Sequence, residues 1–111
     1  MNPTKPERRL TRRLSLRIPL SLRVGESSNL ELQAESIDFS ERGVLLQTDS
    51  ALLVGSEIEL YLKMPQEITG EPKIEWRCGG HVVHVALDTS SNGTVRAGVR
   101  FNWLKVLRNG G

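Results

Sequence analysis

The arginines near the N-terminus are the residues of this chain best suited to bind an anion. Arg12 and Arg13 are adjacent, and three residues separate Arg13 from Arg17. A guanidinium is planar and carries a fork of N–H donors, so it can bind a phosphate or the O6/N7 edge of guanine through two hydrogen bonds. The same spacing recurs at Arg8/Arg12 and at Arg9/Arg13, so the arginines alone are also consistent with a generic basic segment.

A second polar group occurs at residues 38–43, where Asp38, Ser40 and Gly43 are spaced as Asp-x-Ser-x-x-Gly. A carboxylate can accept hydrogen bonds from guanine N1–H and N2–H₂, and a serine hydroxyl adds a donor and an acceptor. Glycine allows a tight turn and leaves room for a ligand. The same pattern is also typical of an ordinary turn between strands, and taken alone it indicates a turn more often than a site.

The remaining reactive residues do not support catalysis. Cys78 is the only cysteine, so no intramolecular disulfide can form, which fits a cytoplasmic location. On a strand and without a recognisable triad, this thiol is better explained by packing. His81 and His84 would point to opposite faces of a strand, and no further ligand lies at metal-binding spacing. We also find no P-loop, dinucleotide fingerprint or nucleophile elbow, so we expect a binding protein that is not an enzyme and has no metal and no cofactor.

Alternation of apolar and polar residues predicts the strands that must position these groups. Period-two or continuous apolar patterns occur at residues 14–24, 30–35, 44–48, 57–64, 74–86 and 94–101. Pro19 indicates a strand start or an edge, and Gly79-Gly80 indicates a bulge or bend within the long fifth strand. About six short strands with almost no helix predict a small antiparallel barrel or sandwich.

The segment at residues 102–108 is predicted to form a short helix or turn. Asn102 would be its N-cap, and Trp103, Leu104 and Leu107 would pack on its inner side.

Length and charge limit the function classes. A chain of 111 residues is enough for one domain, and no apolar run approaches the roughly 20 residues of a transmembrane helix. Residues 1–23 contain seven basic side chains and one acidic side chain, whereas the rest of the chain contains eight basic and twelve acidic ones. A basic N-terminal segment suits a phosphate-bearing ligand, a nucleic acid or an acidic membrane surface.

Taken together, the two motifs resemble the signature of the PilZ domain family, RxxxR followed about one hairpin later by [D/N]xSxxG. The arginine pair precedes the first expected strand, the second motif follows the second strand, and twenty residues separate Arg17 from Asp38. The stretches at residues 7–9, 37–45 and 97–101 also look like this family, so the resemblance covers the chain from about residue 8 to residue 101.

The resemblance implies an all-β protein, a six-stranded antiparallel β-barrel of split-barrel-like form that binds cyclic di-GMP on its outer surface. It implies a flexible basic arm at residues 1–12 and the barrel domain at residues 13–111. Because only about ten residues follow Phe101, the C-terminal helix common in the family is expected to be short.

The resemblance also implies roles for individual residues. Arg13 and Arg17 would contact phosphates and guanine Hoogsteen edges, and Arg12 would assist them. Asp38 and Ser40 would bind a guanine, and Gly43 would keep the turn open. His84 lies on the strand that can supply a residue stacking on the ligand in relatives.

The expected function is a cyclic di-GMP receptor whose N-terminal arm becomes ordered on binding and signals to an unidentified downstream protein. One alternative is a PilZ-like adaptor that binds a protein partner without nucleotide. A second is a basic-arm binder of nucleic acid or membrane surfaces. RNA-binding barrels usually expose aromatic residues, and this chain has only five, so no specific nucleic-acid partner is expected.

Overall fold

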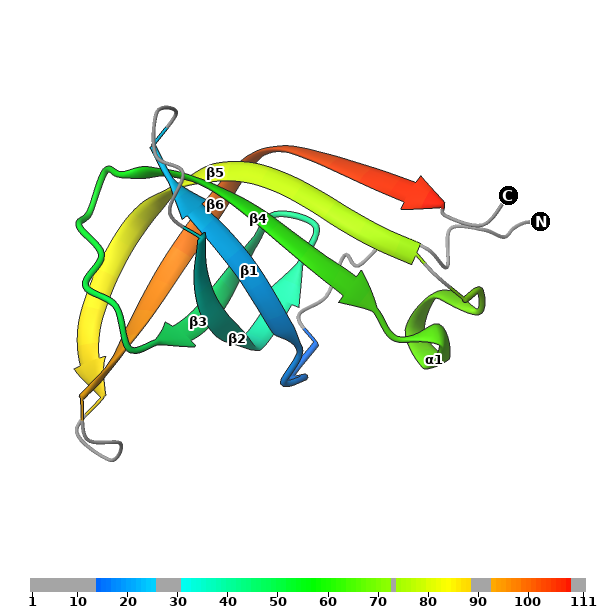
Figure 1. The fold of residues 1–111 in the computed structure, drawn as a ribbon, viewed down its shortest axis with the longest axis horizontal. Coiled ribbons are helices and arrows are strands. Elements are labelled where there is room, and N and C mark those ends of the chain that lie inside the picture. The colour runs from blue at the N-terminus through cyan, green and yellow to red at the C-terminus, as the bar shows by residue number, and fades with distance from the viewer. Residues whose placement is uncertain (1–13, 26–30, 73, 89–92, 109–111) are drawn as a thin grey trace.

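The computed structural model describes residues 14–25, 31–72, 74–88 and 93–108, which form six strands and one short helix (Figure 1). The predicted arm at residues 1–12 lies outside the described residues. The elements are β1 (Pro19–Val24), β2 (Glu31–Ser40), β3 (Gly43–Thr48), β4 (Glu57–Met64), α1 (Gln66–Thr69), β5 (Ile74–Asp88) and β6 (Thr94–Arg108).

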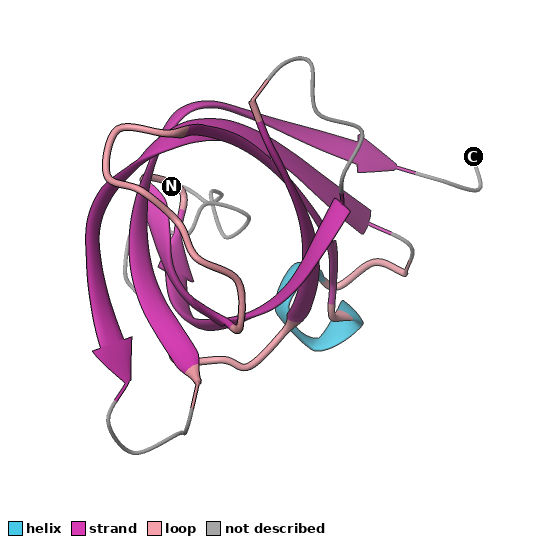
Figure 2. Cartoon of the chain, turned by 60° about the vertical axis from the view of Figure 1, so that its left-hand side comes forward, coloured by secondary structure: helices cyan, strands magenta, loops and turns pink. Residues whose placement is uncertain are grey.

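The six strands close into a barrel in the order β1-β2-β3-β6-β5-β4, and every neighbouring pair is antiparallel. Figure 2 looks along this barrel and shows α1 outside the ring of strands. The prediction of an antiparallel six-stranded barrel is therefore confirmed, and the alternative of a sandwich is wrong.

The core follows from the alternation of apolar residues along the strands. On β4, for example, Ile58, Leu60, Leu62 and Met64 are buried, while the residues between them face outward. Phe39 and Trp76 meet edge to face in the interior, with their ring centroids 5.9 Å apart. Burial of one face of each strand supplies the main driving force for closure of the barrel.

The expected helix at residues 102–108 is wrong, because these residues continue β6, and residues 103–108 pair with residues 74–79 of β5. Asn102 is therefore a strand residue and not an N-cap. The one helix in the described part of the chain is α1, which begins after Pro65 and is followed by Gly70, a glycine with a φ of 77°. No helix among the described residues is long and apolar enough to cross a membrane.

The pairing of β5 is irregular at its glycine pair, as expected, but the extra residue lies on β6. Gly79 is opposite Trp103 and Gly80 is opposite Phe101, so Asn102 of β6 is the extra residue of a β-bulge. An added Cβ at Gly79 would lie 2.2 Å from Nε1 of Trp103. The absence of a side chain at Gly79 is what lets this indole lie flat on β5.

Cys78 is fully buried in the core, and this burial raises the pKa of its thiol from 9.0 to about 12. Above pH 9 the thiol ionises in the unfolded chain but stays protonated in the folded one, so stability present below pH 9 is lost as the pH rises. We predict a fall in the free energy of unfolding of about 1 kcal/mol per pH unit between pH 9 and about pH 11. Urea unfolding at several pH values should show that the free energy of unfolding falls less steeply with pH in Cys78→Ala than in the wild-type chain. Equal slopes in the two proteins would contradict the prediction.

Candidate functional site

A β-bulge in β2 determines where Asp38 points. Ser36 is opposite Leu46 of β3, and Asp38 is opposite Leu45, so Ile37 is an extra residue in the pairing. Leu46 is fully buried and Leu45 is only partly buried, because consecutive residues of a strand face opposite sides. In a regular strand, residues two positions apart point to the same face, so Asp38 would share the buried face of Ser36. The bulge instead turns Asp38 to the outer surface.

A second bulge does the same for His84 in β5. Val82 is opposite Val99 and His84 is opposite Gly98, which leaves Val83 as the extra residue. Val82 is fully buried in the core, whereas the His84 side chain is exposed. Two separate bulges therefore place a carboxylate and an imidazole on the same outer face of the barrel.

These two side chains belong to one row across four strands. Asp38 pairs with Leu45, Leu45 pairs with Gly98, and Gly98 pairs with His84. Neighbouring strands are about 4.8 Å apart, so the row spans roughly 14 Å. An added Cβ at Gly98 would lie 2.4 Å from Cε1 of His84, which shows that the imidazole lies over this glycine.

The row forms the floor of a cleft with a volume of about 460 Å³. Arg42, from the turn after β2, and Arg100, from β6, also line this cleft. Gln47 pairs with Arg96, so a further arginine lies on the same outer face of β6, two residues before Gly98. The basic side chains around the cleft outnumber the single carboxylate of Asp38, and the site therefore suits an anionic ligand.

Neither of the two sequence motifs, RxxxR and [D/N]xSxxG, specifies Arg42 or Arg100, so the sequence analysis did not name them as candidate site residues. The signal for Arg100 was present in the sequence, because Arg96, Gly98 and Arg100 are spaced by two on a predicted strand and so share one face. Arg42 belongs to the turn within the second motif, at a position where that motif accepts any residue.

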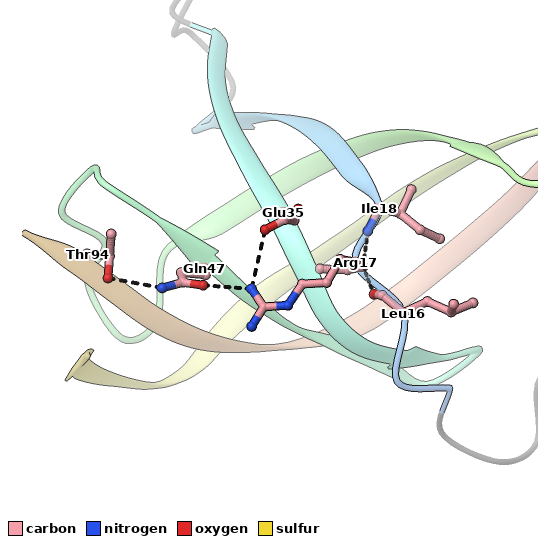
Figure 3. Close-up of polar contacts among 7 residues, drawn as sticks. Leu16, Arg17, Ile18, Glu35, Gln47 and Thr94 are labelled. Atoms are coloured by element: carbon pink, nitrogen blue, oxygen red, sulfur yellow. Dashed lines mark hydrogen bonds and ion pairs between the residues drawn. The ribbon is translucent and has the colours of Figure 1, made fainter. Parts of the chain in front are cut away.

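The Arg17 side chain extends over the outer face of β2 and β3, where it reaches Glu35 and Gln47 (Figure 3). Its Nη1 donates hydrogen bonds to Oε1 of Gln47 at 2.9 Å and to Oε1 of Glu35 at 3.3 Å, and the side chain is about half exposed. Gln47 is two residues from Leu45 on β3, so it points to the same side as the cleft floor. Nε2 of Gln47 in turn donates to Oγ1 of Thr94 at 3.1 Å, which fixes the amide.

The backbone on both sides of Arg17 is held by one buried hydroxyl. Oγ of Ser36 accepts a hydrogen bond from the N–H of Ile18 at 2.9 Å and donates one to the carbonyl of Leu16. The N–H of Ser36 also donates to the carbonyl of Ile18 at 3.0 Å. Ser36 is thus a positioning residue for Arg17, and sequence analysis did not single it out.

Ser40 and Gly43 have structural roles in the turn between β2 and β3. Oγ of Ser40 accepts a hydrogen bond from the N–H of Arg42 at 3.2 Å, and Ser40 is buried. An added Cβ at Gly43 would lie 2.2 Å from the carbonyl oxygen of Val99 on β6. Gly43 therefore allows β3 and β6 to approach each other, and Ser40 shapes the turn that carries Arg42.

Arg12 and Arg13, the other predicted arginines, lie outside the described residues. The chain that follows them is attached to the site, because Leu14 and Phe39 exchange two backbone hydrogen bonds of 2.9 and 3.0 Å. Phe39 directly follows Asp38, so the N-terminal segment joins the barrel beside the cleft. Within the described ranges, no group of three or more His, Cys, Asp or Glu side chains is placed to hold a metal ion.

Loss of the Ser36 hydroxyl should weaken the fold locally. Ser36→Ala leaves the N–H of Ile18 and the carbonyl of Leu16 without this partner, and we expect the free energy of unfolding to fall by about 1–3 kcal/mol. Ser21→Ala, on the outer surface of β1, is the control and should change it by less than about 0.5 kcal/mol. Urea unfolding measures the free energy of unfolding of both variants. An equal loss in the two variants would show that the hydrogen bonds of the Ser36 hydroxyl contribute nothing specific.

Gly43→Ala tests whether Gly43 serves strand packing. The new methyl group must displace the backbone of β6, so we expect a loss of about 2–3 kcal/mol in unfolding free energy. Gly25→Ala is the comparison, because Gly25 has a φ of 76° but open space around it, and only about 1–2 kcal/mol of conformational cost applies there. A smaller effect at residue 43 than at residue 25, measured by thermal unfolding, would contradict this role.

Comparison with known proteins agrees with the fold. The Bacillus subtilis inhibitor of motility, MotI/DgrA, is a solved structure with a TM-score of 0.69 to this chain and 12% sequence identity. The match covers 92% of this chain but only 45% of that one, so this chain spans less than half of its length. At this identity the likeness shows the fold alone. No curated protein matches the chain.

The family model of the PilZ domain matches residues 7–106, which is nearly the whole sequence. That range includes both motifs, the whole of β1 to β5, and β6 except its last two residues. The chain therefore belongs to the PilZ domain family.

Proposed function

We propose that this chain is a receptor for cyclic di-GMP, which it binds in the cleft on the outer face of β2, β3, β6 and β5. The observation that carries the proposal is the row that joins Asp38 to His84, with Arg17 and Arg100 on the same face. PilZ domains are binding and adaptor modules, and the family includes receptors for this ligand.

The two ends of the row suit a guanine base. The carboxylate of Asp38 can accept hydrogen bonds from guanine N1–H and N2–H₂ together, a pair of donors that adenine does not present. The imidazole of His84 lies over Gly98 and offers an exposed face on which a purine can stack. Leu45 and Gly98 between them leave a flat floor for the ligand.

The arginines suit the phosphates and the Hoogsteen edges. Arg100 and Arg42 line the cleft directly, while Arg17 is held next to it by Gln47 and Glu35. An exposed ion pair such as that between Arg17 and Glu35 contributes little to stability, so Arg17 can exchange Glu35 for a phosphate at small cost. Charge-assisted hydrogen bonds to phosphate contribute roughly 1.5–3 kcal/mol each.

The N-terminal segment completes the proposed mechanism. Arg12 and Arg13 directly precede Leu14, which is bonded to β2 beside the cleft. We expect the phosphates of the ligand to bring these arginines over the bound nucleotide and to order the arm, and the ordered arm then presents a new surface to a downstream protein. Equal order parameters of the arm amides with and without ligand would contradict this step.

Isothermal titration calorimetry with cyclic di-GMP tests the receptor function, with GTP and cyclic di-AMP as control ligands. Saturable binding is expected for cyclic di-GMP alone. Arg17→Ala and Asp38→Ala should each weaken it at least about tenfold, because each removes a charge-assisted hydrogen bond. Arg77→Ala removes a cation from the outer face of β5 away from the cleft and should leave the affinity within about twofold.

Absence of binding by the folded wild-type chain would overturn the receptor function. Circular dichroism and a cooperative unfolding transition establish that the protein used is folded. In that case the alternative function of an adaptor that binds a protein without nucleotide would take its place. Equal binding of all three nucleotides, lost steeply with added salt, would instead indicate non-specific electrostatic attraction.

A further inference from the structure

The C-terminal half of β6 has a backbone edge without a strand partner among the described residues. β6 pairs with β3 only over residues 95–100, but it pairs with β5 as far as Arg108. Figure 1 shows this part of β6 as the red arrow that continues past the barrel beside β5. Residues 103–108 are therefore bonded to β5 on one side, and on their other side no strand of the described part of the chain pairs with their N–H and C=O groups, which an extended peptide can join.

The side chains of this segment leave apolar surface exposed on both of its faces. Trp103 and Leu107 are 39% and 38% exposed on one face, and Val106 is 42% exposed on the other. Proteins usually protect such an edge with proline, with a bulge or with several charges. Residues 103–108 contain no proline and pair with β5 without a bulge, and their charges, Lys105 and Arg108, are both positive. Charges of one sign disfavour a basic neighbour and still admit a strand that carries carboxylates.

The charge of the segment indicates what kind of neighbour fits. β6 carries four basic residues and no acidic one, and two of the four, Lys105 and Arg108, lie in the unpaired segment. Lys105 is directly opposite Arg77 of β5. Arg77 is turned toward Glu59 and the Tyr61 ring on β4, whereas Lys105 lies over the Trp103 ring on the segment itself. A carboxylate placed beside Lys105 on an added strand would form an opposite-charge pair across the two strands, which is favourable.

Two occupants from this chain itself fit less well. A second copy, paired antiparallel about the middle of the segment, would place Lys105 of one protomer opposite Lys105 of the other. The N-terminal residues are rich in arginine and would meet the same repulsion.

We propose that residues 102–108 bind an extended segment of another protein as a seventh strand, and that acidic residues alternate with apolar residues in that segment. Its carboxylates lie on the face of Lys105 and Arg77, and its apolar side chains cover Leu104 and Val106 on the opposite face. The interaction is independent of nucleotide binding, because the segment lies outside the row of the cleft.

Nuclear magnetic resonance titration of the full chain with two capped eight-residue peptides tests the proposal. One peptide alternates glutamate and valine, and the other alternates lysine and valine. The acidic peptide should shift the backbone amides of residues 102–108, give cross-strand contacts to them, and bind roughly tenfold more tightly than the basic one. Lys105→Glu should reverse the preference, whereas Lys63→Glu, a matched change on the exposed surface of β4, should leave it unchanged.

Three outcomes would overturn the proposal. The first is equal binding of the two peptides, or shifts away from residues 102–108. The second is a dimer of the free chain, seen by sedimentation, in which the amides of residues 102–108 lie at the contact, since that assigns the edge to a second copy. The third is slow hydrogen exchange along the whole segment in the free monomer, since another part of the chain would then already cover the edge.

Discussion

The cleft depends on two β-bulges, each of one extra residue, which turn the side chain that follows from the core face of its strand to the outer face. In a closed barrel each strand has one face in the core, so a polar residue two positions after a buried one would also be buried. The bulge at Ile37 separates buried Ser36 from outward-facing Asp38, and the bulge at Val83 does the same for His84. Without the first bulge the fold would place an uncompensated carboxylate in an apolar interior, at a cost of several kcal/mol. The barrel and the cleft are thus compatible only because the pairing is irregular at these two points.

Much of the fold was predictable from the sequence, because alternation reports directly which face of a strand is buried. The prediction failed at residues 102–108, where the apolar residues Trp103, Leu104 and Leu107 fit one face of a helix. Short apolar segments of this kind do not distinguish helix from strand. What decides the outcome is pairing with residues 74–79, about thirty positions earlier in the chain, and local sequence carries no record of that partner.

The site was predictable where its residues form a contiguous motif, and not where they depend on register. Asp38 and His84, two of the candidate ligand-binding residues, both line the cleft, and the motif around Asp38 is what directed attention to this region. The structural contributions of Ser36 and Gln47 depend on tertiary contacts, because Ser36 bonds the backbone just before β1 and Gln47 of β3 bonds Arg17 and Thr94. The bulge at Ile37 also has no glycine to mark it, unlike the bulge at Asn102, which lies opposite Gly79-Gly80, so nothing in the sequence indicates the change of register.

The bridge between Leu14 and Phe39 has a kinetic consequence for any ligand of the cleft. Two backbone hydrogen bonds attach the chain beside Asp38, so in the proposed receptor the arginines that directly precede Leu14 would meet a bound anion as tethered partners rather than as independent molecules. Short tethers correspond to effective concentrations on the order of millimolar. The residence time of a ligand in the cleft would then depend on the length of this tether as well as on the contacts made. Insertion of residues between the arginines and Leu14 would shorten the residence time while leaving every side chain in place.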